Sequence, residues 1–225
     1  MPLLEICAGS VESALNANAA KADRIELCAE LSVGGLTPSK GMIHLVKEMV
    51  DIPVYVLIRP RSGDFCYSLL ELEQMKEDVA FCSKMGCEGV VIGALTPDRK
   101  IHERMTYELM QEAGYMDVTF HKAFDETVNP FEALDTLREL GVQRVLTSGG
   151  AATALAGYDR LGELIEEADD DLIIMPGGGI RSENIKHLLS LEAQEYHSAA
   201  LLPGQKHTSK EEVKAMLDCL RQLSV

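Results

Sequence analysis

The sequence has no tryptophan, and aromatic residues make up only 5% of its 225 positions. It also lacks any run of the roughly 20 apolar residues that a membrane-spanning helix needs. Its start has no basic region followed by an apolar core, which would be typical of a secretory signal peptide. No two cysteines have the CxxC spacing of a structural zinc site. We therefore expect neither a membrane protein nor a zinc finger, and we predict a cytoplasmic protein with an aliphatic core.

Basic residues are scarce as well. The chain has 21 lysines and arginines against 36 aspartates and glutamates, which gives a formal net charge of −15. This excess of negative charge opposes binding to nucleic acid phosphates and to anionic membrane surfaces. The six cysteines are too sparse for a disulfide scaffold, and a reducing cytosol keeps them as thiols. Neither nucleic acid nor a membrane is an expected partner.

Short apolar segments recur about every 25 to 30 residues, and a helical pattern follows each of them. Eight such units in 225 residues favour a closed barrel of parallel strands over an open sheet. No linker or change of composition divides the chain, so we predict one α/β domain over residues 1–225, a (β/α)8 TIM barrel. The expected strands are Leu3–Cys7, Arg24–Cys28, Val54–Arg59, Gly89–Gly93, Asp117–His121, Arg144–Thr147, Leu172–Met175 and Glu195–Ser198.

Three helix starts carry recognisable caps. Ser68 with Glu71, and Ser209 with Glu212, fit the capping box, in which a hydroxyl and a carboxylate satisfy free backbone amides reciprocally. Asn129 before Pro130 predicts another start, because proline at the first helical position loses no hydrogen bond.

The first two strands both place a glutamate and a cysteine two residues apart. Side chains alternate along a strand, so Glu5 shares a face with Cys7, and Glu26 shares a face with Cys28. We expect both carboxylates inside the barrel near its upper rim, with Arg59 as their nearest partner. They could transfer protons or hold a ligand while an arginine clamps an anion, or they could form an inert salt-bridged rim.

Two loops rich in glycine follow the sixth and seventh strands. Glycine lets backbone amides approach an anion closely, and the last loops of such barrels often hold phosphate. We predict an anion site here for a phosphate or carboxylate, although tight turning alone would also require glycine. The predicted anion-binding residues are Ser148, Gly149, Gly150, Gly177, Gly178 and Gly179.

His121 and His197 end the fifth and eighth strands, where each could act as general acid or base, or as a metal ligand. A hydrogen-bonded structural role is the alternative for both histidines. The long loop after the third strand contains Arg61 and Asp64; the aspartate shapes the turn, and the loop can form a lid.

Motifs along the whole chain resemble the CutC family. The motifs that carry the resemblance are Leu4-Glu-Ile-Cys-Ala8, Arg24-Ile-Glu-Leu-Cys28, Gly34-Gly-Leu-Thr-Pro-Ser39, Ile58-Arg-Pro-Arg-Ser-Gly-Asp-Phe65, Gly93-Ala-Leu-Thr96, Thr119-Phe-His121, Ala123-Phe-Asp125, Arg144-Val-Leu-Thr-Ser-Gly149, Met175-Pro-Gly-Gly-Gly-Ile180 and Glu195-Tyr-His197. The resemblance implies a cytosolic TIM-like barrel associated by name with copper homeostasis, with Cu(I) binding proposed for some members. It implies no known reaction.

The resemblance also implies a set of rim residues. The chain departs from the family pattern at Ser62, where glycine is frequent, and at Lys122, where arginine is frequent, which puts the loop geometry and any bidentate anion contact in doubt. The residues that correspond are Glu5, Glu26, Cys28, Arg59, Arg61, Asp64, His121, Asp125, Ser148 and His197.

Two functions follow as hypotheses. In the first, Cys7 and Cys28 bind Cu(I), a metal that thiolates suit, although buried cysteines more often pack as small apolar residues. In the second, an enzyme of the isomerase or lyase type acts on a small phosphorylated or carboxylated metabolite. Its acid–base groups and its orienting arginine would be Glu5, Glu26, Arg59, His121 and His197. A regulatory or scaffold protein that has kept an inactive barrel is a third hypothesis, and a homo-oligomer is expected.

Overall fold

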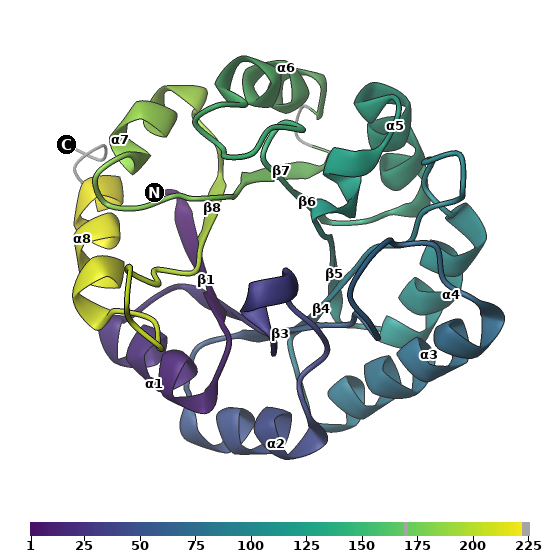
Figure 1. Ribbon diagram of the computed structural model, residues 1–225, viewed down its shortest axis with the longest axis horizontal. Helices are drawn as coiled ribbons and strands as arrows, with labels where there is room; N and C mark the ends of the chain where they lie inside the picture. The colour runs from purple at the N-terminus through teal and green to yellow at the C-terminus, as the bar shows by residue number, and fades with distance from the viewer. Residues whose placement is uncertain (169–170, 222–225) are drawn as a thin grey trace.

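Eight parallel strands form the barrel that the sequence predicts. The computed structural model describes residues 1–168 and 171–221. The strands pair in the order β7-β6-β5-β4-β3-β2-β1-β8, and a parallel bridge between Gly177 and His197 brings the two ends of the sheet together (Figure 1). The strands are β1 Leu3–Ala8, β2 Arg24–Leu27, β3 Val54–Leu57, β4 Gly89–Ile92, β5 Asp117–Phe120, β6 Arg144–Thr147, β7 Ile173–Pro176 and β8 Glu195–Ser198. All eight predicted strands are confirmed; β6 and β8 have the predicted bounds, and the other six have ends that shift by one or two residues.

Helices surround the strands on the outside of the barrel (Figure 1). They are α1 Val11–Ala20, α2 Lys40–Met49, α3 Leu69–Lys84, α4 Glu103–Ala113, α5 Pro130–Leu140, α6 Tyr158–Ala168, α7 Ile185–Leu188 and α8 Lys210–Arg221, with short 3-10 helices η1 Leu31–Val33, η2 Lys122–Glu126 and η3 Leu189–Leu191. In the described part of the chain, no helix combines the length and the apolar character needed to span a membrane.

The helix caps follow the sequence with one exception. Ser68 and Glu71 form the complete capping box, and Asn129 accepts the amide hydrogens of the first turn of α5. Ser209 accepts the amide hydrogen of Glu212, as predicted, but the Glu212 carboxylate does not return to its own helix. It accepts hydrogen bonds from the Ser182 amide at 2.6 Å and the Ser182 hydroxyl at 2.9 Å. The second capping box is therefore only half correct: the predicted return bond from Glu212 to the Ser209 amide is wrong, because the Glu212 carboxylate binds the loop before α7.

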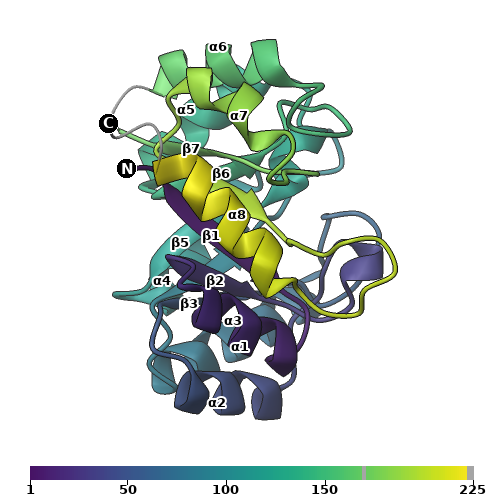
Figure 2. The ribbon, with the colours of Figure 1, turned by 90° about the vertical axis from the view of Figure 1, so that its left-hand side faces the viewer.

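The apolar core lies mainly between the strands and the helices, whereas the barrel interior is partly polar. Buried charged residues on the strands include Glu5, Arg24, Glu26, Arg144 and Glu195. Seen from the side, the loops that follow the strands gather at the end of the barrel opposite the N-terminus (Figure 2). In barrels of this kind, the C-terminal ends of the strands carry the functional site.

A glycine on β4 makes room for an aromatic ring inside the barrel. A Cβ atom at Gly89 would lie 2.5 Å from the buried ring of Tyr55. We expect Gly89→Ala to lower the free energy of unfolding by about 1–3 kcal/mol, because neither the strand nor the ring can yield easily.

Gly41→Ala on α2 is the matched control, since a Cβ there meets nothing within 4 Å. It should leave the free energy of unfolding unchanged or raise it by up to about 1 kcal/mol. Equal stabilities of the two variants in chemical denaturation would contradict the packing described for Tyr55.

Candidate functional site

Three neighbouring strands bring polar side chains together inside the barrel. Glu5 on β1 lies in register with Arg24 on β2 and with His197 on β8. Two residues further along β1, Cys7 lies in register with Glu26 on β2. Residues in register on adjacent strands point to the same face, so the alternation predicted for Glu5 and Cys7 extends across β8, β1 and β2.

A buried chain of charges occupies the deeper level. The Arg24 guanidinium donates to Glu5 at 2.5 Å and also to Glu195. Arg144 donates to the same Glu195 carboxylate at 3.1 Å and to Asp117 at 3.2 Å. Burial would raise the pKa of Glu5, but Arg24 and His197 outweigh it and lower that pKa to about 2. Glu5 is therefore a permanently ionised carboxylate in the barrel interior.

This arrangement corrects one expectation from the sequence. Arg59 was expected to partner Glu5 and Glu26, but its guanidinium donates to the backbone carbonyls of Val33, Gly35 and Gly63 at 2.9, 3.1 and 2.9 Å. It ties the η1 loop to the loop after β3. The expected pairing is wrong because Arg24, one strand closer, already reaches Glu5.

Glu5 also orients His197. Its second carboxylate oxygen lies 2.8 Å from His197 Nδ1, and His197 Nε2 lies 3.5 Å from a Glu26 carboxylate oxygen. Burial alone would lower the pKa of His197, but Glu26 and Glu5 outweigh it and raise the pKa. Burial is also the main reason that the pKa of Glu26 is raised. The imidazole is therefore held between two carboxylates with its Nε2 edge toward Glu26.

Cysteine thiols complete this cluster. The ligand atoms of Cys7, Glu26 and His197 lie within 4.8 Å of one another, and Cys7 Sγ lies 3.4 Å from Cys28 Sγ. The contact with Cys28, burial and Glu26 together raise the pKa of the Cys7 thiol well above its usual range. Both cysteines are buried and free of disulfide bonds. The structure thus brings together the two cysteines that the sequence analysis selected as metal ligands.

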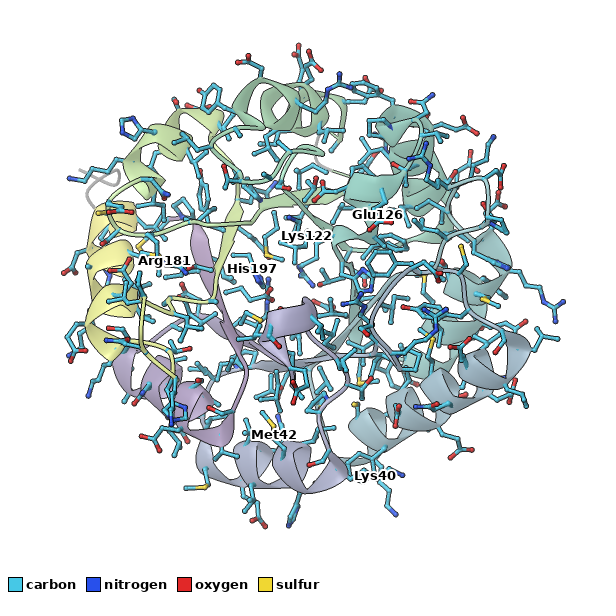
Figure 3. The ribbon with its side chains drawn as sticks, viewed as in Figure 1. Lys40, Met42, Lys122, Glu126, Arg181 and His197 are labelled. Atoms are coloured by element: carbon cyan, nitrogen blue, oxygen red, sulfur yellow. The ribbon has the colours of Figure 1, made fainter. Side chains whose placement is uncertain are left out.

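A cavity of about 470 Å³ opens above the cluster at the mouth of the barrel. Figure 3 shows His197 and Lys122 extending into this opening. The cavity is lined by charged and polar groups from several strand ends, among them Cys7, Glu26, Arg59, His121, Lys122, Asp125, Glu126, Gly178, Gly179, Arg181, His197 and Ser198.

His121 lies in the cavity wall at the end of β5. Its Nδ1 accepts a hydrogen bond from the Ala123 amide at 3.1 Å, and its ring centroid lies 5.0 Å from that of Phe65. Burial, reinforced by the nearby Arg59 charge, lowers the pKa of His121 to about 3. The imidazole is therefore neutral at physiological pH. A Cβ atom at Gly93 would lie 2.3 Å from this ring, which explains why β4 is followed by glycine.

The first glycine loop is filled by a side chain of the protein itself. The Asp125 carboxylate accepts hydrogen bonds from the Ser148 amide at 3.1 Å, the Ser148 hydroxyl at 2.9 Å and the Gly150 amide at 2.9 Å. The Gly149 amide donates to Thr147 Oγ1 at 2.9 Å. Asp125 thus occupies the position that the sequence analysis predicts for an anion, which is a role that an internal carboxylate can take in a backbone nest.

The second glycine loop is arranged differently. Gly177 continues the strand ladder, since its amide donates to the Thr147 carbonyl at 2.9 Å. Gly178 and Gly179 have φ angles of 105° and 72° and line the cavity beside Lys122. Glycine is favoured at both positions because side chains rarely adopt such angles.

The long loop after β3 is closed by its own residues. Arg61 donates to Asp64 at 2.9 Å and to Glu71 at 2.6 Å, and Asp64 accepts the Cys66 amide at 3.0 Å. Asp64 therefore makes the kind of hydrogen bonds that its predicted role in shaping this loop requires.

Several site residues were missed from the sequence. Arg24 and Glu195 lie two residues before Glu26 and His197, so strand alternation could have placed them on the interior face. Lys122 was singled out only as a departure from a family pattern, and no local signal pointed to Arg181. Their place at the cavity depends on the loops that follow β5 and β7.

Comparisons with known proteins identify relatives of this chain. Residues 2–201 match the model of the CutC family. The human copper homeostasis protein cutC homolog is 48% identical over 199 residues, covering 88% of this chain and 73% of that protein. The family protein CutC of Xylella fastidiosa strain Temecula1 is 46% identical over 198 residues, covering 88% of this chain and 74% of the relative.

Solved structures agree with the barrel. The copper homeostasis protein CutC of Streptococcus agalactiae superimposes with a TM-score of 0.83 at 31% identity, over 88% of this chain and 99% of that protein. Thiamine phosphate pyrophosphorylase from Pyrococcus furiosus superimposes with a TM-score of 0.68 at 12% identity, over 99% and 96% of the two chains. This second likeness concerns the fold alone.

The charge chain predicts a large stability effect. Arg24→Met would leave Glu5 and Glu195 without their shared cation, in side chains that are 1% and 8% exposed. We expect the free energy of unfolding to fall by about 3–5 kcal/mol, as is usual when one partner of a buried ion pair is removed.

Arg104→Met is the control, because Arg104 pairs with Glu108 at 2.8 Å on the surface of α4. An exposed pair of this kind contributes about 0–1 kcal/mol. Denaturant unfolding of both variants measures the difference, and a similar small loss in each would show that the interior pairing is not needed.

His121 predicts how stability changes in acid. Its pKa is lowered from 6.5 to about 3, so the unfolded chain binds a proton that the folded chain does not bind between these values. The contribution of neutral His121 to the free energy of unfolding is fully present above pH 6.5. It is lost as the pH falls toward 3, with a slope of at most about 1.4 kcal/mol per pH unit.

Chemical denaturation at several pH values should show this slope in the parent protein and a smaller slope in His121→Asn. An imidazole resonance of His121 that titrates near pH 6.5 would contradict the lowered pKa of this residue.

Proposed function

This chain belongs to the CutC family, and we propose that it binds Cu(I) through Cys7 and Cys28, with His197 as the third donor. The contact that carries the proposal is the 3.4 Å approach of two thiol sulfurs from neighbouring strands. Sulfur ligands select Cu(I) over harder cations, and imidazole is compatible with copper as well. Copper is here the cargo of the protein, in keeping with the copper homeostasis named for its relatives.

The surroundings of His197 support its role as a donor. Glu5 lies 2.8 Å from Nδ1, which fixes the ring and leaves Nε2 directed toward Glu26 and Cys7. A carboxylate on the far nitrogen is the usual way in which proteins orient a metal-binding histidine. Glu26 offers hard oxygen atoms, which suit Cu(I) poorly, so we assign it no bond to the copper.

The same geometry favours a reducing location. All six cysteines are free. Cys7 and Cys28 are so close that an oxidising compartment would favour a disulfide between them. We therefore place the copper-binding function in the cytoplasm.

A second candidate is an acid–base enzyme of the isomerase or lyase type. The observation that favours it is a histidine between two carboxylates in the wall of a 470 Å³ cavity. A cavity of this size suits a small metabolite, and a histidine whose pKa is set by neighbouring carboxylates can exchange protons with a substrate. Binding of a small metabolite in the cavity by the copper-free protein would favour this candidate over the first.

Thiol substitutions test the copper proposal. Anaerobic titration with Cu(I), in competition with a chromophoric Cu(I) chelator, should show one saturable site per chain. Cys7→Ser and Cys28→Ser should each abolish that site, because a hydroxyl is a poor ligand for Cu(I).

Cys66→Ser is the matched control, since Cys66 lies in the loop after β3, partly exposed and away from the cluster. It should bind Cu(I) as the parent protein does. Retention of the site in both Cys7→Ser and Cys28→Ser would refute the proposed ligands.

A further inference from the structure

The wall of the cavity formed by β3 and β5 contains two buried donors without acceptors. Within residues 1–168 and 171–221, Arg59 Nε and His121 Nε2 have no hydrogen-bond partner. Both residues line the cavity, and both lie against Phe65, at 4.8 Å for the guanidinium and 5.0 Å for the imidazole. Buried donors are normally satisfied, so an unfilled pair at one cavity wall indicates a position for a ligand oxygen.

The hydrogen on His121 can be placed from its contacts. Nδ1 accepts the Ala123 amide hydrogen at 3.1 Å, so in the neutral ring the hydrogen is on Nε2. The lowered pKa of His121 agrees with a neutral ring. Nε2 is therefore a donor, and only an acceptor atom can satisfy it.

Arg59 adds positive charge to the same wall. Two of its nitrogens donate to three neutral carbonyls, and no carboxylate in the described chain forms an ion pair with it, although the residue is only 6% exposed. A buried guanidinium without a counter-charge favours an anion nearby.

The part of the cavity beside the second glycine loop offers further donors. Lys122 extends into the barrel mouth (Figure 3), where its Nζ lies 3.4 Å from an Asp125 carboxylate oxygen and would lie 3.4 Å from a Cβ atom at Gly178. The described backbone supplies no acceptor for the amides of Gly178 and Gly179. Glycine amides such as these can donate to an oxyanion that approaches the loop closely. Asp125 fills the first glycine loop but leaves the second one open.

We infer that the cavity binds a small organic molecule with two anionic groups, one against His121 and Arg59 and the other against Lys122 and the amides of Gly178 and Gly179. The volume of about 470 Å³ suits a small metabolite. Each oxyanion is a carboxylate or a phosphate. This inference goes beyond copper binding, since it uses neither cysteine, and it gives the second candidate function a substrate class.

Calorimetric titration of the copper-free full chain, in the presence of a Cu(I) chelator, tests the inference without reference to the copper site. The probes are 2-phosphoglycolate, malonate and inorganic phosphate. We expect one site per chain, with at least one of the two organic probes binding about tenfold more tightly than phosphate, because it engages both sets of donors. Tighter binding of 2-phosphoglycolate supports a phosphate with a carboxylate, and tighter binding of malonate supports a dicarboxylate.

Variants of His121 and Lys122 test the two sets of donors separately. His121→Asn keeps an acceptor near the Nδ1 position but lacks the distal donor, whereas His121→Gln carries an amide near the Nε2 position. We expect the best probe to bind about tenfold more weakly to His121→Asn and to Lys122→Met, with partial recovery in His121→Gln. Lys100→Met is the control, because Lys100 pairs with Glu132 at 2.7 Å away from the cavity.

A nitrogen-15 label on histidine adds a readout that a purely structural role would not change. The His121 Nε2 resonance should shift in step with probe saturation. Three results would each overturn the inference: no saturable binding of any probe, inorganic phosphate binding as tightly as both organic probes, or unchanged affinity in both His121→Asn and Lys122→Met.

Discussion

The site depends on the buried ion pairs that connect Glu5, Arg24, Glu195 and Arg144 inside the barrel. Charges at this depth are tolerated only when they are paired and hydrogen-bonded. Arg24 satisfies one oxygen of Glu5, and the other oxygen is then left to face His197. The orientation of the His197 imidazole is therefore set by the ion pair between Glu5 and Arg24, the two residues on β1 and β2 that lie in register with it.

Above this level, the mouth of the barrel divides into two chemically different regions. On the side of β8, β1 and β2, soft and acidic groups gather: Cys7, Cys28, His197 and Glu26. On the sides of β3 and β5, Arg59 Nε and His121 Nε2 have no hydrogen-bond partner within the described residues, and both residues line the cavity. A metal cation suits the first region and an anion suits the second. One cavity can therefore hold both without competition for the same atoms.

Much of the barrel follows from sequence periodicity, because strand alternation and apolar runs are local properties. The same alternation correctly places Glu5, Cys7, Glu26 and Cys28 on shared faces. The hydrogen-bond partner of each side chain, in contrast, does not follow from periodicity. Arg24 rather than Arg59 reaches Glu5, Asp125 rather than a ligand fills the Ser148 loop, and Glu212 bonds Ser182 rather than its own helix. Each depends on register and loop paths between segments far apart in sequence, which local patterns do not determine.

The most direct test of the copper site is X-ray absorption at the copper edge of the full chain loaded with one equivalent of Cu(I) under anaerobic conditions. Coordination by Cys7, Cys28 and His197 predicts two sulfur scatterers and one nitrogen scatterer around copper. Cys28→Ser should retain no copper in this site, in agreement with the loss of binding expected in the titration. A shell of only nitrogen and oxygen atoms, or a two-sulfur shell that persists in Cys28→Ser, would contradict the site.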